Sequence, residues 1–250
     1  MTNKYMYFIA NWKMFGDLKS LKSLNKVINF SSKYKRKKFK LIYCPPYTLL
    51  DSFSKKIKKT RIELGAQNCH FEISNGPFTG SISPSMLKNI GSNYVIIGHS
   101  ENRNIGDTDS QINKKINSSI KSGLKIIFCI GETLTQKKNK MTNKILRKQI
   151  LKGLFKINKL NKVIIAYEPI WSIGTGVVPG TFELDRSISF IKNILKNKLK
   201  IKNPKVLYGG SVNSKNVKNL ASINGIDGFL IGGASQKANN FIDIVKKTII

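Results

Sequence analysis

Hydrophobic residues recur along the chain in short continuous runs, and a longer polar stretch follows each run. Apolar residues occupy consecutive positions in these runs, which is typical of parallel strands with both faces buried. The pattern predicts eight strands, over Tyr7–Asn11, Leu41–Cys44, Ile62–Gln67, Tyr94–Gly98, Ile126–Gly131, Val163–Glu168, Val206–Gly209 and Gly228–Ile231.

The polar stretches between these runs have the pattern of amphipathic helices, most clearly over Asp17–Phe30 and Thr108–Ser122. Asp17 and Asp107 are predicted to cap helices, and Gly123 is predicted to end one. Strands that alternate with helices indicate an α/β fold with a parallel sheet, either open or closed into a barrel. Eight such units match the usual size of a (β/α)8 barrel. Because no linker or change in composition divides the chain, we expect a single domain over residues 1–250.

The composition excludes several classes of protein. Hydrophobic residues make up 40% of the 250, which suits a packed globular protein. No apolar run reaches the roughly 18 residues of a membrane span, and Tyr5–Ala10 is too short for a secretory signal. Three scattered cysteines, Cys44, Cys69 and Cys129, fit a reducing compartment and predict neither a disulfide framework nor a cysteine-ligated zinc site. We therefore expect a cytoplasmic protein without membrane contact.

The charge is far from balanced. Lysine and arginine total 44 against 13 aspartate and glutamate, which gives a formal net charge of +31. Such an excess attracts nucleic acid and other polyanions. The basic runs, for example Lys33–Lys40 and Lys137–Lys140, recur along the chain and lack interleaved arginine and stacking aromatics. We interpret them as solvated helix faces, with polyanion contact only through non-specific charge.

Polar side chains follow several of the predicted strands, at the barrel end where catalytic groups cluster. Asn11 and Lys13 follow the first strand, His99 and Glu101 the fourth, and Glu168 the sixth. Glu168 comes directly after an apolar run, so it should be partly desolvated, which suits a proton acceptor. Lys13 supplies positive charge for an anionic substrate or a developing enolate. This set predicts proton transfer next to a carbonyl group.

Glycine pairs end the last two predicted strands, as Gly209-Gly210-Ser211 and Gly232-Gly233-Ala234-Ser235. Glycine lets backbone N–H groups approach an oxyanion, and phosphate sites recur at this place in barrels. The chain has no G-x-G-x-x-G after its first strand and no G-x-x-x-x-G-K-[ST] motif, which argues against dinucleotide and nucleoside triphosphate sites. The combined pattern favours a phosphorylated substrate, with no metal and no cofactor.

Seven motifs together resemble the triosephosphate isomerase family. They occur in the family's order from the first strand to the last: Asn11-Trp12-Lys13, Gly65-Ala66-Gln67-Asn68, Gly98-His99-Ser100-Glu101, Cys129-Ile130-Gly131-Glu132, YEPIWSIGTG from Tyr167, YGGSV from Tyr208 and IGGAS from Ile231. The resemblance implies a (β/α)8 barrel that interconverts dihydroxyacetone phosphate and glyceraldehyde 3-phosphate, in glycolysis and gluconeogenesis. One alternative is a basic barrel that binds polyanions. A second is another phosphate-binding barrel enzyme, and the joint presence of Lys13, His99 and Glu168 disfavours this second alternative.

The resemblance also implies roles for single residues. Glu168 should move the proton between carbons, neutral His99 should polarise the carbonyl, and Asn11 and Lys13 should stabilise the enediolate. Glu101 should position Lys13. The remaining implied residues are Cys129, which should pack behind Glu168, and the phosphate-binding Gly174, Ser211, Gly232 and Gly233.

Three segments depart from the family pattern. The loop over residues 169–179 should close over the substrate, but its far end reads Val177-Val178-Pro179 where the family has a flexible hinge. In the family, the segment that corresponds to residues 76–81 inserts into the neighbouring subunit. Here this segment ends in Ser81 instead of Glu, and Asn102 replaces an Arg. This joint change implies a lost ion pair between subunits. Thr79 of that segment is retained, so we still expect a homodimer.

Overall fold

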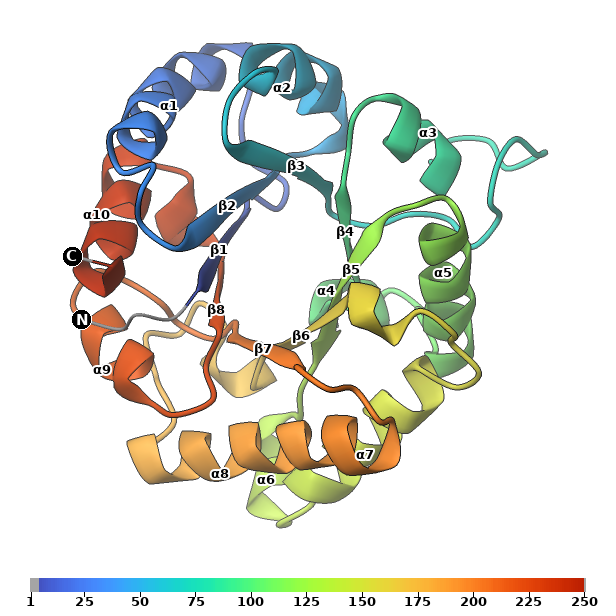
Figure 1. Cartoon of the computed structure of the whole chain (residues 1–250). Helices are drawn as coiled ribbons and strands as arrows, with labels where there is room; N and C mark the ends of the chain where they lie inside the picture. The colour runs from blue at the N-terminus through green and yellow to red at the C-terminus, as the bar shows by residue number, and fades with distance from the viewer. Residues whose placement is uncertain (1–4, 250) are drawn as a thin grey trace.

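The predicted strands form one closed barrel in which all eight are parallel and follow each other in sequence order. The computed structural model describes residues 5–249, so the predicted domain of 1–250 extends beyond the described residues at both ends. Figure 1 looks along the barrel. The strands are β1 (Met6–Asn11), β2 (Phe39–Cys44), β3 (Ile62–Ala66), β4 (Tyr94–Ile97), β5 (Lys125–Ile130), β6 (Val163–Tyr167), β7 (Lys205–Tyr208) and β8 (Gly228–Ile231).

All eight predicted strands are therefore confirmed, and their ends agree with the prediction to within two residues. The predictions place the carboxyl ends of five strands one residue too far, at Gln67, Gly98, Gly131, Glu168 and Gly209. At these positions the chain turns from the sheet into loops. Gly98 shows the cause, since its φ of +77° departs from the extended conformation of a strand.

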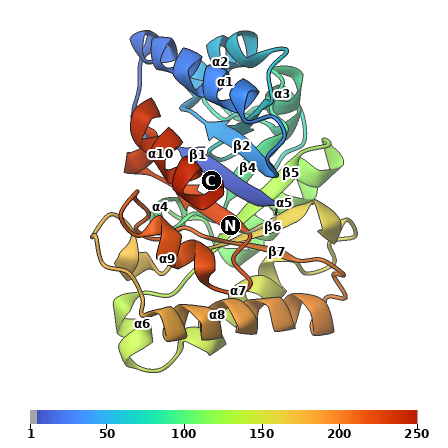
Figure 2. The same ribbon diagram turned by 60° about the vertical axis from the view of Figure 1, so that its left-hand side comes forward.

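Helices cover the outside of the barrel, as Figure 2 shows from the side. The longer helices follow the strands as expected for a (β/α)8 fold. None of the described helices is long and apolar enough to cross a membrane. Their bounds are α1 (Leu24–Lys33), α2 (Leu50–Ile57), α3 (Pro84–Asn89), α4 (Ser100–Asn104), α5 (Asp109–Lys121), α6 (Leu134–Lys138), α7 (Thr142–Gly153), α8 (Thr181–Asn193), α9 (Val217–Ser222) and α10 (Ala238–Ile249), with shorter helical turns η1 (Leu18–Ser23), η2 (Tyr47–Leu49), η3 (Leu160–Lys162), η4 (Ile170–Ser172), η5 (Ile194–Lys198) and η6 (Gly233–Ser235).

The predicted helix ends are partly confirmed. Asp17 caps η1 by accepting a hydrogen bond from the backbone N–H of Ser20 at 2.9 Å. Gly123 follows the end of α5 with a φ of +88°, a conformation that favours glycine. The prediction for Asp107 is wrong, because Thr108 caps α5. Asp107 instead places its carboxylate 2.7 Å from the Lys115 ammonium, and that ion pair uses its oxygens.

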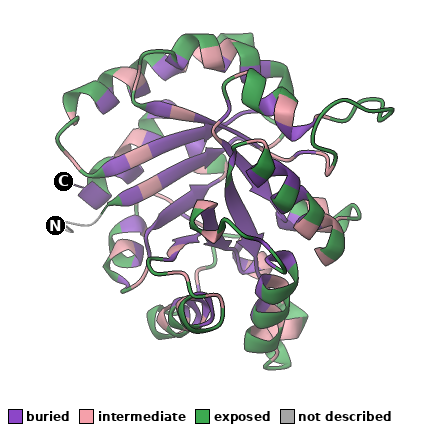
Figure 3. Cartoon of the chain, turned by 45° about the vertical axis from the view of Figure 1, so that its right-hand side comes forward, coloured by how far each residue is buried: buried purple, intermediate pink, exposed green. Residues whose placement is uncertain are grey.

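Two layers of apolar side chains hold the barrel together, and Figure 3 shows most of the strand residues as buried. Side chains alternate between the two faces of a strand. One set, which includes Phe8 and Val95, packs against the helices, whereas the other, which includes Ile9 and Ile96, fills the inside of the barrel. Because both faces of each strand are buried, apolar residues are needed at consecutive positions along it.

The same alternation places two polar side chains at the carboxyl end of the barrel. Asn11 is two residues beyond the inward-facing Ile9, and Glu168 is two residues beyond the inward-facing Ala166. Both therefore continue the inner row of their strands. His99 does not follow from the alternation, because it comes an odd number of residues after Ile96. The left-handed backbone at Gly98 breaks the alternation before it.

Candidate active site

A cavity of ≈ 260 Å³ lies at the carboxyl ends of the strands. It joins the polar residues that follow β1, β4 and β6 to the glycine-rich turns after β7 and β8. No group of three or more His, Cys, Asp or Glu side chains within residues 5–249 is arranged to hold a metal ion. The lining residues are Asn11, Lys13, His99, Glu168, Ile173, Gly174, Gly209, Gly210, Ser211, Val212, Asn213, Leu230, Gly232, Gly233 and Ala234.

Glu168 is held as a buried carboxylate at the floor of this cavity. Its residue exposure is 3%, and its backbone N–H donates to the carbonyl of Ile130 at 2.8 Å. Oε1 lies 3.6 Å from Nε2 of His99, whereas the buried Oε2 has no hydrogen-bond partner among the described residues. An oxygen without a donor keeps its lone pairs free to accept a proton from a bound molecule.

Two neighbours shape the space around this carboxylate. A Cβ at Gly209 would lie 2.5 Å from Cγ of Glu168, so only glycine leaves room for the side chain there. Cys129 lies beside the carboxylate from β5. Burial raises the pKa of the Cys129 thiol well above its ordinary value, and the charge of Glu168 raises it further. The thiol therefore stays neutral and does not compete for the proton.

The backbone of α4 sets the tautomer of His99. Its Nδ1 accepts a hydrogen bond from the backbone N–H of Glu101 at 3.2 Å. A nitrogen that accepts carries no proton, so in the neutral ring the proton is on Nε2. Nε2 faces Glu168 across the cavity floor. The imidazole is thus oriented to donate a hydrogen bond to an oxygen bound in the cavity.

Lys13 enters the cavity from a strained loop after β1. Its φ is +56°, which is unusual for a residue with a side chain. The amide of Gln67 holds this backbone by donating to the carbonyl oxygens of Lys13 at 2.8 Å and Cys44 at 2.9 Å. The Lys13 ammonium lies 2.6 Å from the carboxylate of Glu101. Asn11 completes the turn, since its Oδ1 accepts from the backbone N–H of Lys13.

Glycines after β6, β7 and β8 form the opposite wall. A Cβ at Gly174 or Gly233 would meet no atom within 4 Å, and one at Gly232 would lie 3.5 Å from Cε of Lys13. The backbone at these positions is therefore open to the cavity. Ser211 lies beside them and donates its backbone N–H to Ser172 Oγ at 3.4 Å. Backbone N–H groups converging beside a lysine can hold a phosphate group.

The loop over residues 169–179 covers one side of the cavity. Its first half is anchored by Trp171, whose indole N–H donates to Oε1 of Glu132 at 3.0 Å. The hydroxyl of Ser172 lies 2.8 Å from that of Tyr208 and 2.6 Å from the carbonyl of Val177. Residues 174–177 are exposed. The loop thus has one buried, hydrogen-bonded end and an exposed tip above the substrate space.

Glu132 is the buried anchor of this loop. The phenol of Tyr167 donates to both carboxylate oxygens at 3.3 Å, and the Glu132 carbonyl accepts from the backbone N–H of Ile170. Burial raises the pKa of Glu132, while the hydrogen bonds from Trp171 and Tyr167 oppose that rise. Each of its oxygens is already engaged, so this carboxylate holds the loop in place.

Comparison with known proteins agrees with this geometry. The sequence model of a family described as Triosephosphate isomerase matches residues 6–248. A Triosephosphate isomerase of Thermodesulfovibrio yellowstonii is 41% identical over 244 residues, covering 96% of this chain and 98% of the relative. That of Dictyostelium discoideum is 39% identical over 255 residues, covering 100% and 98%. The chain belongs to the triosephosphate isomerase family.

Comparison with a solved structure shows the same fold. The crystal structure of triosephosphate isomerase from Bartonella henselae superposes with a TM-score of 0.89 at 34% sequence identity. The match covers 97% of this chain and 98% of that one. The (β/α)8 barrel predicted from the sequence is therefore confirmed.

Most of the residues singled out in the sequence come together at one place in this triosephosphate isomerase fold. Asn11, Lys13, His99 and Glu168 line a single cavity, and so do the four residues predicted to bind phosphate, Gly174, Ser211, Gly232 and Gly233. Glu101 and Cys129 contact the site from behind. Thr79 is exposed on the segment between β3 and α3, which projects from the barrel in Figure 1.

Several contributors to the site were missed or given another role. Gln67 ends a predicted strand and belongs to one of the quoted motifs, yet nothing in the sequence indicates its hydrogen bond to the Lys13 carbonyl. Gly209 was predicted as part of an anion site, whereas its missing side chain makes room for Glu168. Glu132 and Trp171 stand within the quoted motifs, but their contact joins two strands and is visible only in the fold.

Proposed function

We propose that the chain interconverts dihydroxyacetone phosphate and glyceraldehyde 3-phosphate through an enediolate, as a step of glycolysis and gluconeogenesis. One observation carries the proposal. A buried carboxylate oxygen of Glu168 without a hydrogen-bond partner shares a cavity with Nε2 of His99 and the ammonium of Lys13. This arrangement offers a base on one side of a bound carbon and two electrophiles for its oxygen.

In the first step Glu168 removes a proton from the carbon next to the carbonyl. The electron pair of that C–H bond forms the new carbon–carbon double bond, and the carbonyl electrons move onto oxygen. The His99 Nε2–H donates a hydrogen bond to that oxygen, and Lys13 offsets its developing charge. Donors that are already oriented cost no rearrangement when the charge appears.

In the second step Glu168 gives a proton to the neighbouring carbon. His99 carries a proton between the two oxygens, so that the former carbonyl becomes a hydroxyl and the former hydroxyl becomes a carbonyl. Proton number and charge are unchanged overall. One carboxylate serves both carbons, because both lie within reach of a side chain fixed at a strand end.

The glycine wall holds the phosphate group of the substrate. Backbone N–H groups of Gly174, Ser211, Gly232 and Gly233 surround the position next to Lys13. The loop of residues 169–179 closes over this group from its Glu132 anchor and excludes water. Its tip glycines, Gly174 and Gly176, have φ values of +71° and +79° that favour glycine.

We further propose that the protein acts as a homodimer in the cytoplasm. The segment carrying Thr79 presents apolar side chains, including Phe78 at 39% exposure and Ile73 at 37%. Met14, beside the active-site Lys13, is 93% exposed. Large exposed apolar residues on a projecting segment mark an interface. Sedimentation equilibrium at micromolar concentration should give twice the chain mass, and a monomer would contradict the proposal.

The test of the activity is direct. Purified protein should convert glyceraldehyde 3-phosphate to dihydroxyacetone phosphate at a rate linear in enzyme, and the same final ratio of the two should be reached from either side. A basic barrel that only binds polyanions would leave the substrate unchanged. That result, obtained with folded protein, would reject the proposed function.

A further inference from the structure

A second and larger cavity lies at the opposite end of the barrel. Its volume is ≈ 670 Å³, and it is lined by the amino-terminal residues of several strands and by the loops that enter β6 and β7. This size suits a small-molecule ligand. The lining residues are Tyr5, Tyr7, Lys40, Tyr94, Lys125, Asn158, Leu160, Asn161, Lys162, Val163, Ile164, Leu199, Lys200, Ile201, Lys202, Asn203 and Lys205.

The lining is basic beyond the bias of the chain. Six of these 17 residues are lysines, against 44 lysines and arginines in the 250-residue sequence. No carboxylate among the described residues lines the cavity. The remaining polar lining consists of three tyrosines and three asparagines, which can donate hydrogen bonds.

Three of the lysines belong to the inside of the barrel and not to a solvated helix face. Lys40, Lys125 and Lys205 each lie two residues before an inward-facing apolar residue of the same strand. They therefore form the end layer of the inner row of side chains. Charged side chains gathered around a concavity with apolar walls focus its electrostatic field.

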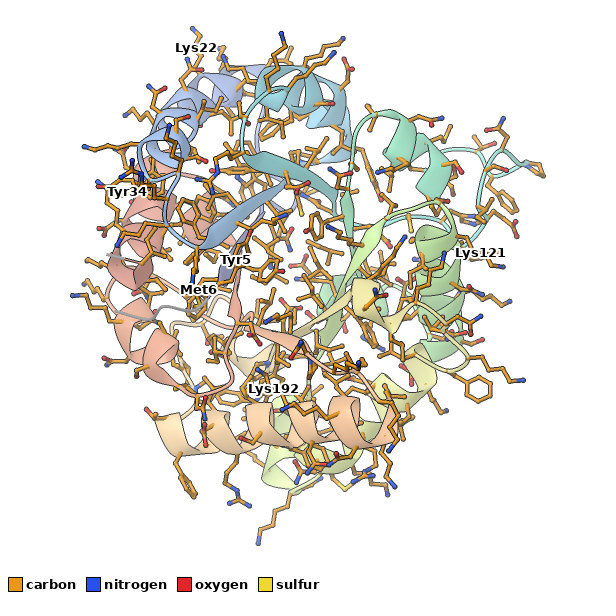
Figure 4. The ribbon with its side chains drawn as sticks, in the orientation of Figure 1. Tyr5, Met6, Lys22, Tyr34, Lys121 and Lys192 are labelled. Atoms are coloured by element: carbon orange, nitrogen blue, oxygen red, sulfur yellow. The ribbon has the colours of Figure 1, made fainter. Side chains whose placement is uncertain are left out.

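The nearby carboxylates leave much of this charge without a counterion. Glu63 pairs with Lys40 at 2.8 Å, and Asp227 with Lys192 at 2.8 Å and Lys205 at 3.4 Å. No such partner is found within residues 5–249 for the ammonium groups of Lys125, Lys162, Lys200 and Lys202. Figure 4 shows Tyr5 close to the middle of the ring of strands and Lys192 on the side of α8 that faces it.

The aromatic residues of the cavity contribute donors. Burial raises the pKa of Tyr94 to about 12, so its phenol keeps its proton at neutral pH. The ammonium of Lys125 lies 5.3 Å from the centre of the Tyr94 ring. Tyr5 is 40% exposed, and its ring contacts that of Tyr7 edge to face at 5.5 Å. An exposed ring at the rim offers a surface for a flat group of the ligand.

From these features we infer that the amino-terminal cavity is a binding site for a small anion with two or more linked phosphate groups. Lysine ammonium groups bind phosphate as point charges, and several within one cavity favour a ligand that spreads its charge over several phosphates. A single phosphate would contact only part of this ring of lysines. The site is separate from the isomerase cavity, because it opens at the other end of the strands.

The test is equilibrium titration of the full-length protein with inorganic tripolyphosphate at ~150 mM salt, where exposed charges more than ~8 Å apart are largely screened. We expect one binding site per chain and at least about tenfold weaker binding of orthophosphate. The isomerase rate should be unaffected by bound tripolyphosphate. Competition with the triose substrate would place the ligand in the catalytic cavity and overturn the inference.

Two double variants that each lose two lysines distinguish binding in the cavity from attraction by the overall positive charge of the protein. Lys162→Gln with Lys202→Gln alters the cavity, while Lys22→Gln with Lys121→Gln removes two lysines that Figure 4 shows on the outside of the molecule. The cavity variant should bind tripolyphosphate about tenfold more weakly and the control within about twofold of wild type. Both should isomerise substrate at the wild-type rate.

Three further outcomes would overturn the inference: no saturable binding of tripolyphosphate, equal weakening in both variants, or binding of single-stranded DNA alone. The last two would assign the basic residues to non-specific contact with nucleic acid. Titration with ATP then distinguishes two sources of the same chemistry. Tighter binding of ATP than of tripolyphosphate, lost in Tyr5→Ala, indicates a nucleotide, whereas equal binding indicates inorganic polyphosphate.

Discussion

Two buried glutamates lie at the ends of neighbouring strands, and their surroundings differ. Glu132, after β5, receives hydrogen bonds on both carboxylate oxygens, from Tyr167 and Trp171. Glu168, after β6, is almost as buried, but its Oε2 has no partner among the described residues. Two carboxylates that are similarly buried thus differ in the hydrogen bonds that they receive. On this difference we base the proposal that Glu168 accepts a proton and that Glu132 holds the loop.

The largest expected effect comes from removing the free oxygen. Glu168→Gln keeps the shape of the side chain but abolishes its basicity, so kcat should fall by about 10³- to 10⁴-fold. The measurement is steady-state kinetics with glyceraldehyde 3-phosphate, with circular dichroism to show that the variant is folded. A loss of less than tenfold would mean that another group accepts the proton.

Lys13 should have the next largest effect, since it supplies the positive charge at the reacting oxygen. Lys13→Met should lower kcat/KM by about 10²- to 10³-fold. Lys55→Met is the matched control, because Lys55 also pairs with a carboxylate at 2.6 Å but lies on the outer helix α2. The control should stay within about twofold of wild type. Equal losses in both variants would contradict a local role for Lys13.

Gly209 tests how closely the position of Glu168 is defined. The methyl group of Gly209→Ala would meet Cγ of Glu168 and displace the carboxylate, which should reduce kcat by about 10²-fold. At Gly180 an added Cβ meets no atom within 4 Å, so Gly180→Ala should change kcat by less than about twofold. Equal kcat values for the two variants would contradict a role of Gly209 in placing Glu168.

Glu132 should have the smallest effect on catalysis and a distinct effect on stability. Its pKa is raised in the folded state, so the folded protein holds this proton more tightly than the unfolded chain does. Its contribution to the free energy of unfolding therefore falls as pH rises from the unfolded value, about 4.3, through the raised folded value.

This sign can be measured with Glu132→Gln, which does not titrate. Urea unfolding of both proteins between about pH 4 and pH 7 should show wild type losing stability relative to the variant as pH increases. A relative gain by wild type over the same range would show that the hydrogen bonds from Trp171 and Tyr167 outweigh burial.

The sequence predicted the barrel well, because its strands are dry on both faces and so read as unbroken apolar runs. It also predicted that Asn11, Lys13, His99 and Glu168 line one cavity, since polar groups at strand ends meet at one rim. Contacts between residues of different strands could not be predicted from the sequence. The gap that Gly209 leaves for Glu168, and the tie from Gln67 to Lys13, depend on how separate strands are set against each other.

The positions of the basic residues in the fold also could not be predicted from the sequence. Read along the chain, the lysines were interpreted as solvated helix faces. Strand alternation in the folded barrel turns Lys40, Lys125 and Lys205 inward at one end, where loops distant in sequence add further lysines. Asp107 was predicted to cap a helix for a similar reason. Capping rules consider only nearby positions in the sequence, so they do not reveal its ion pair with Lys115.

The central claim is that Glu168 moves the proton, and isotope exchange tests it most directly. Dihydroxyacetone phosphate is incubated with enzyme in D₂O, and deuterium bound to carbon is followed by NMR. Wild type should introduce deuterium at the carbon next to the carbonyl, because the base exchanges its proton with solvent. Glu168→Gln should leave this carbon unlabelled over the same time. Labelling by the variant at the wild-type rate would contradict the account.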